Sequence, residues 1–309
     1  MSERKVLIGN SLDVLKQLDA ESVDVCVTSP PYWGLRDYGT DPQIWGGQTN
    51  CLHEWDESNH CIHCHVWKGQ LGLEPNPLDY IKHLCLIFDE VKRVLKPTGA
   101  CWVNLGDTYA NSYKEEGIKQ KSLIQIPSRF AIAMTDRGWI LRNEIIWQKP
   151  NAMPCSVKDR FTVDFEKFFF FTKNPKYYFM QIKEPAKLPT VRSIYGKQKE
   201  GNNNPAYSGR VYIANGSRNA RTTWSIPPKA SGEEHCAMFP PALIDIPIRA
   251  CCPPGGIVLD PFCGSGTTLQ YCREHDINAI GIELNPEYED IIRRKAKINI
   301  KTLEEVVKE

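Results

Sequence analysis

The chain alternates short apolar runs with longer stretches in which apolar residues recur every three or four positions. The short runs predict buried strands at residues 23–27, 102–105, 256–260 and 279–283. The longer stretches predict helices at residues 80–95, ending near Gly99, and at residues 268–275. Strands and helices in repetition predict an α/β sheet with helices on both faces.

Two further segments, residues 139–148 and 165–179, have the pattern of hairpin strands, and we expect the second to turn at Lys173, Asn174 and Pro175. Hairpin strands are antiparallel. The predicted sheet is therefore mixed, not wholly parallel.

Composition indicates a folded globular protein. The 309 residues are 41% hydrophobic and 24% charged, which excludes wholesale disorder and fibrous repeats. The aromatic run at residues 168–171 is far shorter than the ~20 apolar residues that span a bilayer, and residues 6–8 are too few for a signal peptide. We expect a cytoplasmic protein with no membrane segment, whose twelve cysteines are buried thiols or metal ligands.

Positive charge is concentrated in residues 181–230, which hold nine basic and two acidic residues although the net charge of the chain is only +1. Turn-forming residues in this segment are interleaved with Tyr195, Tyr207, Tyr212 and Trp224. Such a segment favours a nucleic-acid surface. A solvated loop with incidental charge is the alternative.

A glycine-bearing loop, residues 260–268, lies between a predicted strand and a predicted helix. Gly264 and Gly266 allow a ligand to approach the backbone closely, and the amides that open the helix are donors for an anionic group. The spacing matches neither the phosphate loop nor the three-glycine dinucleotide pattern. Glu283 ends the next strand, where nucleoside-binding sheets place an acid that accepts hydrogen bonds from ribose. The loop and the acid together predict a nucleoside site.

A second loop, Ser29-Pro30-Pro31-Tyr32, directly follows the strand at residues 23–27. Two consecutive prolines stiffen the turn and remove two amide donors, which leaves carbonyl acceptors. Acceptors beside an aromatic ring suit an aromatic amine.

The S-P-P-Y loop at residues 29–32 and the D-P-F-C-G-S-G-T-T loop at residues 260–268 resemble the two signature motifs of the amino-methylating DNA methyltransferases, in the permuted order of the β group. The resemblance implies a Rossmann-like fold that depends on S-adenosylmethionine. It further implies a catalytic half at residues 1–180, a target recognition region at residues 181–230 and a cofactor-binding half at residues 231–309.

Carried onto this chain, the resemblance assigns cofactor contacts to the glycine loop, to Glu283 for the ribose, and to Phe239 and Pro240 for the methionine end. Asn10 stands where relatives often have Asp. The full set of implied cofactor residues is Asn10, Phe239, Pro240, Asp260, Pro261, Phe262, Gly264, Ser265, Gly266, Thr267 and Glu283.

The implied chemistry is direct in-line transfer of a methyl group to an exocyclic amine, without a covalent intermediate. The Ser29 side chain and the Pro30 carbonyl accept the amine hydrogens, and Tyr32 stacks on a base flipped out of the duplex. Serine in the first position favours N4 of cytosine over N6 of adenine, and both remain open. Cys155 resembles the nucleophile of the carbon-5 cytosine methylases, but nothing else of that family surrounds it.

Cys51, His53, Cys61 and Cys64 have the spacing of a structural zinc knuckle, inserted at about residues 45–67. His60, His63 and His65 are alternatives for one ligand, and a cysteine-rich loop without metal is the alternative for the whole.

The expected partner is double-stranded DNA, with Arg210, Arg218 and Arg221 as candidate contacts. The resemblance also allows a cognate restriction endonuclease, and the protein is expected to be a monomer or homodimer. Residues 106–122 are a candidate loop that closes on DNA. Two rivals remain: an RNA substrate, and a zinc-bearing DNA-binding protein whose methylase core has decayed.

Overall fold

The computed structural model describes residues 2–47, 50–110, 117–185, 217–228, 239–297 and 301–302. The chain divides into two compact units, one formed by Met1–Phe179 with Thr222–Glu309 and the other by Met180–Arg221. Within the described residues, no helix is both long and apolar enough to cross a bilayer.

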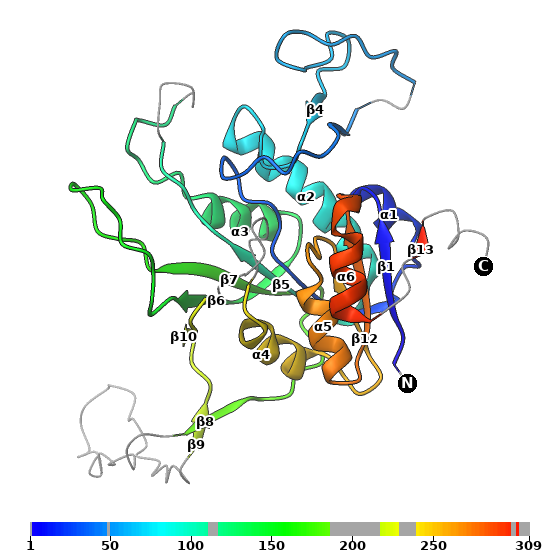
Figure 1. Ribbon diagram of the computed structural model, residues 1–309, viewed down its shortest axis with the longest axis vertical. Coiled ribbons are helices and arrows are strands. Elements are labelled where there is room, and N and C mark those ends of the chain that lie inside the picture. The colour runs from blue at the N-terminus through cyan, green and yellow to red at the C-terminus, as the bar shows by residue number, and fades with distance from the viewer. Residues whose placement is uncertain are drawn as a thin grey trace, which may run out of the picture. The chain divides into compact units, whose positions relative to one another are not determined.

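The larger unit is built on a nine-stranded sheet with the order β10-β6-β7-β5-β2-β11-β12-β1-β13 (Figure 1). β7 is antiparallel to its neighbours β5 and β6, and the other neighbouring strands are parallel. The sheet is therefore mixed, as the sequence predicts. The strands are β1 (Arg4–Ile8), β2 (Val23–Thr28), β5 (Leu95–Leu105), β6 (Ile140–Gln148), β7 (Phe165–Thr172), β10 (Thr223–Ser225), β11 (Ile257–Asp260), β12 (Asn278–Glu283) and β13 (Lys301–Thr302).

Helices cover both faces of this sheet. Successive residues of a strand point to opposite faces, and on β7 Phe170 stacks on Trp102, whose indole donates to Cys251 of α4, whereas Phe169 and Phe171 pack against Phe130 of α3. α4 and α3 therefore lie on opposite faces. The helices are α1 (Ser11–Gln17), α2 (Pro77–Val94), α3 (Ile126–Asp136), α4 (Pro241–Cys251), α5 (Thr267–Glu274) and α6 (Glu289–Ala296), with a short 3₁₀ helix η1 (Pro286–Tyr288).

The central strands are buried on both sides, which explains their unbroken apolar runs. All six residues of β2 are buried, as are the four phenylalanines of β7 at residues 168–171. α2 begins at Pro77, three residues before the predicted start, because the Asn76 side chain accepts from the amides of Leu78 and Asp79.

The predicted hairpin within residues 165–179 is wrong. β7 ends at Thr172 and its partner in the hairpin is β6, so the connection is residues 149–164. After Thr172 the chain bends away because the Asn174 side chain donates to the Pro97 carbonyl and the Tyr178 amide donates to the Thr98 carbonyl. The residues directly after the bend therefore contact β5 instead of pairing with β7, and residues 173–182 form no strand.

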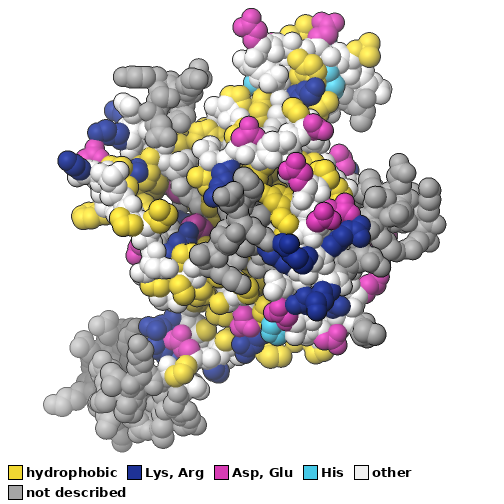
Figure 2. All heavy atoms as spheres, viewed as in Figure 1, with side chains coloured by type: hydrophobic (Ala, Val, Ile, Leu, Met, Phe, Trp, Pro, Cys, Tyr) yellow, Lys and Arg dark blue, Asp and Glu magenta, His cyan; other side chains and the backbone are white. Residues whose placement is uncertain are grey.

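Exposed apolar side chains gather on the β6–β7 connection, where Met153 is 87% and Phe161 is 95% exposed. Elsewhere on the face seen in Figure 2, acidic and basic side chains are intermingled, with no field of a single sign over the described residues.

Two small hairpins complete the described structure. β3 (Gln43–Trp45) pairs with β4 (Trp67–Gly69) at the base of the cysteine-rich insertion. In the smaller unit, β8 (Lys183–Pro185) pairs with β9 (Ser217–Asn219).

Candidate active site

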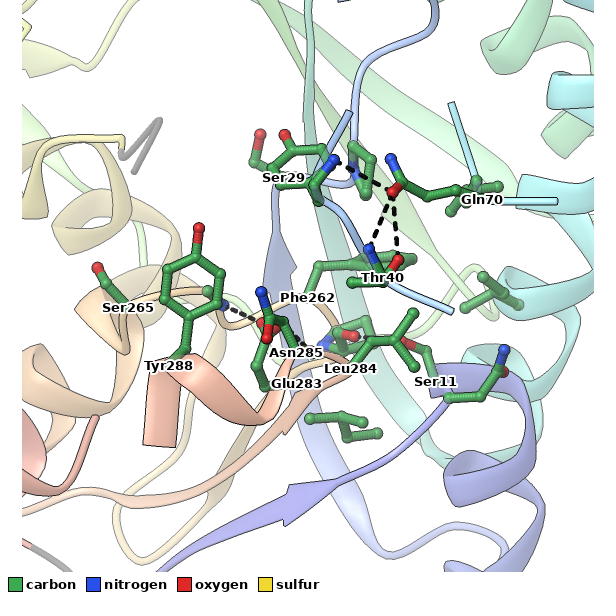
Figure 3. Close-up of a pocket in the computed structure, with 18 of the residues that line it drawn as sticks. Ser11, Ser29, Thr40, Gln70, Phe262, Ser265, Glu283, Leu284, Asn285 and Tyr288 are labelled. Atoms are coloured by element: carbon green, nitrogen blue, oxygen red, sulfur yellow. Dashed lines mark hydrogen bonds between the residues drawn. The ribbon is translucent and has the colours of Figure 1, made fainter. Parts of the chain in front are cut away.

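A cavity opens where the parallel strands β2, β11 and β12 end. Ser29 and Pro31 follow β2, Phe262 and Gly264 follow β11, and Glu283 ends β12 (Figure 3). Ligands of α/β sheets bind at such carboxyl ends. The space between the lining atoms, including the solvent at the mouth of the cavity, is about 840 Å³.

The cavity brings together two predicted loops that are more than two hundred residues apart in the sequence. Of the predicted catalytic and cofactor residues, the lining includes Asn10, Ser29, Pro31, Pro261, Phe262, Gly264, Ser265 and Glu283. It does not include Pro30, Tyr32, Phe239, Pro240, Asp260, Gly266 and Thr267. The two loops therefore share one site, although not every residue predicted from them lines it.

Asp260 is a structural residue in this arrangement. It is 2% exposed, its two oxygens accept from the hydroxyls of Thr28 and Thr268 at 2.6 Å, and the Phe262 amide donates to it at 3.2 Å. Burial raises its pKa to about 6 against the effect of these donors. Asp260 thus joins the ends of β2 and β11 to α5 and holds the glycine loop in place.

The backbone conformation requires glycine at both positions of the loop, and at Gly266 a neighbouring side chain adds a second reason. Gly264 and Gly266 have φ of 50° and 82°, a region that side chains disfavour. A Cβ on Gly266 would also lie 3.3 Å from Ile292 of α6, whereas a Cβ on Gly264 would meet open space. Gly266 is the N-cap of α5, so the loop passes directly into the helix.

Glu283 faces the cavity with its carboxylate already oriented by the backbone. The amides of Gly264 and Asn285 donate to its two oxygens, each at 2.8 Å. A carboxylate has about four acceptor sites, so it retains capacity for two further donors such as vicinal hydroxyls. Burial raises the pKa of Glu283 to about 7.

The Tyr32 side chain lies beside the cavity in a polar network. Its hydroxyl donates to Glu166 at 2.7 Å, with the Asn104 side-chain oxygen as an alternative acceptor at 2.9 Å, and it accepts from the Ser29 hydroxyl at 3.3 Å. Gly106 makes room for the ring, because a Cβ there would lie 2.5 Å from it. Burial, with the Glu166 carboxylate next, raises the pKa of Tyr32 well above its usual value, so the phenol keeps its proton.

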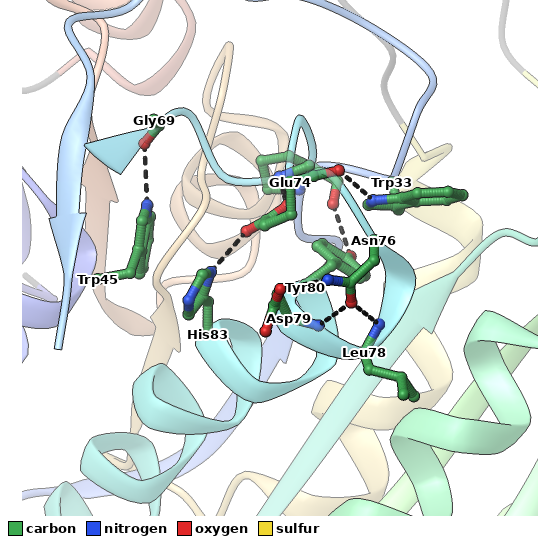
Figure 4. A network of polar contacts seen from close by, with 11 residues as sticks. Trp33, Trp45, Gly69, Glu74, Asn76, Leu78, Asp79, Tyr80 and His83 are labelled. Carbon is green, nitrogen blue, oxygen red and sulfur yellow. Dashed lines mark hydrogen bonds and ion pairs between the residues drawn. The ribbon is translucent and has the colours of Figure 1, made fainter. Parts of the chain in front are cut away.

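The diproline turn is held from the side by residues 72–80. The hydroxyl of Tyr80, a buried residue of α2, donates to the Pro31 carbonyl at 2.7 Å, and the Trp33 indole donates to the Glu74 carbonyl at 3.0 Å (Figure 4). The Gly34 amide donates to the Gly72 carbonyl at 2.8 Å. Three hydrogen bonds therefore fix residues 31–34 against α2 and the segment before it.

A buried Glu74–His83 pair stabilises this support. The Glu74 carboxylate accepts from the Gly72 amide and lies 3.0 Å from Nδ1 of His83. His83 stacks between Trp45 and Trp67 of the β3–β4 hairpin, with ring centroids 5.4 and 5.7 Å apart. The diproline turn, α2 and the base of the insertion are thus one packed assembly.

Part of the cavity wall is formed by residues that the sequence does not predict. Tyr38, Thr40, Trp45 and Gln70 also line the cavity, and the buried Gln70 accepts from the backbone amides of Tyr38 and Thr40. These residues flank the insertion and form no recurrent spacing. The only sequence signal is that Tyr38 and Thr40 follow the diproline turn within a few residues.

The predicted metal residues lie close together. The potential ligand atoms of Cys51, His53, Cys61 and Cys64 are all within 4.8 Å of one another. The sulfurs of Cys51 and Cys61 are 3.7 Å apart, and the Cys64 sulfur is 3.4 Å from Nδ1 of His53. Of the alternative ligands, His63 instead faces Glu54 at 3.7 Å.

The candidate DNA contacts divide between described and undescribed residues. Arg218 and Arg221 both donate to Glu184 at 2.7 Å within the smaller unit. These hydrogen bonds, that from Arg218 first, lower the pKa of Glu184. Arg210 lies outside the described residues, as does part of the candidate loop at residues 106–122.

The mixed sheet, its strand order and the cavity at its carboxyl edge define an α/β methyltransferase fold of the kind that depends on S-adenosylmethionine. Two solved structures share it: the PvuII DNA methyltransferase (cytosine-N4-specific), with a TM-score of 0.60 and 19% identity over 98% of this chain and 96% of that one, and the M1.HpyAVI–SAM complex, with a TM-score of 0.53 and 18% identity over 96% and 100%.

A family model described as "DNA methylase" matches residues 23–294. The chain is 37% identical to the type II methyltransferase M.SmaI of Serratia marcescens, over 94% of this chain and 91% of that protein, and 39% identical to M.Cfr9I of Citrobacter freundii, over 92% and 84%. The chain therefore belongs to the DNA methylase family, as the two loops indicate.

Proposed function

We propose that this protein transfers the methyl group of S-adenosylmethionine to the exocyclic N4 amine of cytosine in duplex DNA, with the target base flipped out. The observation that carries the proposal is the single cavity lined by both Ser29 of the diproline turn and Gly264 of the glycine loop. A methyl donor on one wall and an amine on the other are then adjacent, as in-line transfer requires.

The residues present fit the cofactor. Glu283 has acceptor capacity for the ribose hydroxyls, and the apolar side chains of Phe262, Leu71 and Ile87 form a wall that excludes water. Bound there, S-adenosylmethionine supplies a methyl group on a positively charged sulfur. The role of the chain's own residues is to orient the amine and to accept the positive charge that it develops.

The choice of cytosine depends on Ser29, because the resemblance associates serine at this position with cytosine enzymes. Both hydrogens of either amine demand acceptors, and the Ser29 hydroxyl and the Pro30 carbonyl are the proposed pair. Tyr80 already donates to the Pro31 carbonyl, which supports assigning the Pro30 carbonyl to the substrate.

We further propose that residues 181–230 read the DNA sequence, with Arg210, Arg218 and Arg221 as contacts. Glu184 keeps Arg218 and Arg221 together in the structure, and phosphate or base acceptors would take its place when DNA binds. By analogy with the type II relatives, a restriction endonuclease of the same specificity is the proposed biological partner.

We propose that Cys51, His53, Cys61 and Cys64 hold one structural zinc ion. Ligands on tetrahedral zinc, at about 2.3 Å for sulfur and 2.0 Å for nitrogen, are separated by about 3.8 Å for two sulfurs and about 3.5 Å for sulfur and nitrogen. The corresponding separations here are 3.7 and 3.4 Å. Four protein ligands leave no open position for water, so the ion would brace the insertion without taking part in the chemistry.

The proposed reaction is tested by incubating random-sequence duplex DNA with the protein and isotopically labelled S-adenosylmethionine, then digesting the DNA and identifying the labelled nucleoside by mass spectrometry. We expect N4-methylcytosine, and no product from the Ser29→Ala variant, whose cofactor affinity should be unchanged. N6-methyladenine would overturn the choice of base. In a parallel reaction that contains both RNA and DNA, label found in the RNA and not in the DNA would contradict DNA as the substrate.

A further inference from the structure

A directed chain of hydrogen bonds leaves the cavity at Ser29 and ends at a carboxylate. The Ser29 hydroxyl donates to the Tyr32 hydroxyl at 3.3 Å, and the Tyr32 hydroxyl donates to Oε2 of Glu166 at 2.7 Å. Glu166 lies on β7, 137 positions after Ser29, and no sequence motif singles it out. Only Ser29 of the three lines the cavity.

The Asn104 side chain helps to show which groups donate and which accept in this chain of hydrogen bonds. Its side-chain nitrogen donates to the Lys167 carbonyl at 3.2 Å, so its oxygen is the atom turned toward Tyr32, at 2.9 Å. An amide oxygen accepts a hydrogen bond but is not a base at neutral pH. Glu166 is therefore the one basic group that the Tyr32 hydroxyl reaches among the described residues.

Glu166 is paired with one lysine side chain. Lys149, from the loop after β6, pairs with the other carboxylate oxygen and lies 4.6 Å from the Trp147 ring. The next residue of β7, Lys167, pairs instead with Glu144 of β6 at 3.1 Å and bonds to Ser128 of α3. Tyr32 contributes a neutral phenol, because burial raises its pKa.

We propose that Glu166 receives the proton that the target amine releases on methylation, through Ser29 and Tyr32. As the amine nitrogen bonds to the methyl carbon, the carbon–sulfur bond breaks, the sulfur becomes a neutral thioether and the nitrogen carries positive charge. One N–H proton passes to Ser29, the Ser29 proton passes to Tyr32, and the Tyr32 proton passes to Glu166. The products are a neutral methylated base and a carboxylic acid beside Lys149, which returns its proton to water.

A serine at position 29 can accept the proton of the amine only with the help of such a relay. An alcohol is a very weak base, so it takes a proton from the amine only if it gives up its own at the same time. A carboxylate two hydrogen bonds away supplies the driving force. The proposal rests on the proposed methyl transfer but applies equally to cytosine and adenine amines. Glu166 acts through Tyr32 without touching the substrate.

The test is the rate of a single turnover with the full-length protein and duplex DNA. Glu166→Gln keeps the shape of the side chain but should lower the rate by roughly 100-fold, within the usual range for proton-transfer catalysis. Cofactor and DNA dissociation constants should not change. Glu144→Gln, on the neighbouring strand, is the matched control and should retain the wild-type rate.

A second variant distinguishes a proton relay from a purely structural role of these residues. Tyr32→Phe breaks the chain at its centre, so adding Glu166→Gln to it should cause little further loss, whereas two independent supporting roles would give multiplied losses. A wild-type rate in Glu166→Gln, or multiplied losses in the double variant, would overturn the relay. Absence of methylation by the wild-type protein on any DNA would instead overturn the proposed function.

Discussion

At the scale of single residues, one buried hydroxyl holds the Pro31 carbonyl of the diproline turn. Tyr80 is fully buried and donates to the Pro31 carbonyl, so the position of the neighbouring Pro30 carbonyl follows from a residue of α2 that never touches the substrate. A displacement of about 1 Å at a reacting group costs roughly 100-fold in rate.

Tyr80→Phe should therefore lower kcat by roughly 10- to 100-fold and the free energy of unfolding by about 1 kcal/mol, with no change in cofactor affinity. Tyr271→Phe is the control, since the Tyr271 hydroxyl of α5 donates to Asp245 at 2.8 Å. It should show a similar loss of stability with wild-type kcat. Equal kcat in the two variants would contradict the role of Tyr80.

Glu283 makes stability depend on pH. Burial raises its pKa from 4.5 to about 7, so folding takes up a proton between these values. Its contribution to stability is fully present below pH 4.5 and is lost as the pH rises to about 7. Asp260, with a pKa of about 6, adds a loss of the same sign at lower pH.

Urea unfolding at about pH 6 and pH 8 isolates the Glu283 part of this effect. The wild-type protein without cofactor should be more stable at the lower pH, and Glu283→Gln should show a smaller difference between the two. An unchanged difference in the variant would show that another group is responsible.

At the scale of elements, the sequence predicts those strands and loops that a local pattern of residues determines. The strands β2, β11 and β12 carry continuous apolar runs and end in polar loops, so both the strands and the two site loops were predictable. The partner of β7 was not, because the choice between β6 and residues 173–179 depends on contacts at Pro97 and Thr98. Glu166 and Gln70 reach the site only through strand pairing and the fold of the insertion.

The insertion between β3 and β4 should owe its fold to zinc. Metal analysis of protein purified without chelator should give about one zinc per chain. Removing the metal should expose Trp45 and Trp67, which are 5% and 6% exposed in the structure, and so shift tryptophan fluorescence. Cys64→Ser should bind less metal, while Cys155→Ser, at an exposed cysteine outside the cluster, should bind the normal amount. Less than about 0.2 zinc per wild-type chain would contradict the site.

At the scale of the whole molecule, two compact units separate methyl transfer from the proposed reading of DNA. The cavity and its supports lie entirely within the larger unit. Within the smaller unit, β8 and β9 flank residues 186–216, and Pro185 pairs with Ser217. A tight turn can therefore join these two residues without straining the larger unit.

Replacing residues 186–216 by a short Gly-Ser turn should leave thermal stability and cofactor binding near the wild-type values. It should abolish sequence-specific methylation, because this stretch supplies most of the basic charge of residues 181–230. Calorimetry with S-adenosylhomocysteine and methylation of a DNA library measure the two properties. Methylation of the same sequence by the shortened protein would contradict the assignment.

The central claim is that the diproline turn and the glycine loop present an amine and a methyl donor to each other in one cavity. A crystal structure with S-adenosylhomocysteine is the decisive measurement. We expect the ribose hydroxyls on Glu283 and the sulfur facing Ser29. A ligand bound outside the cavity, or one whose sulfur faces away from Ser29, would contradict it.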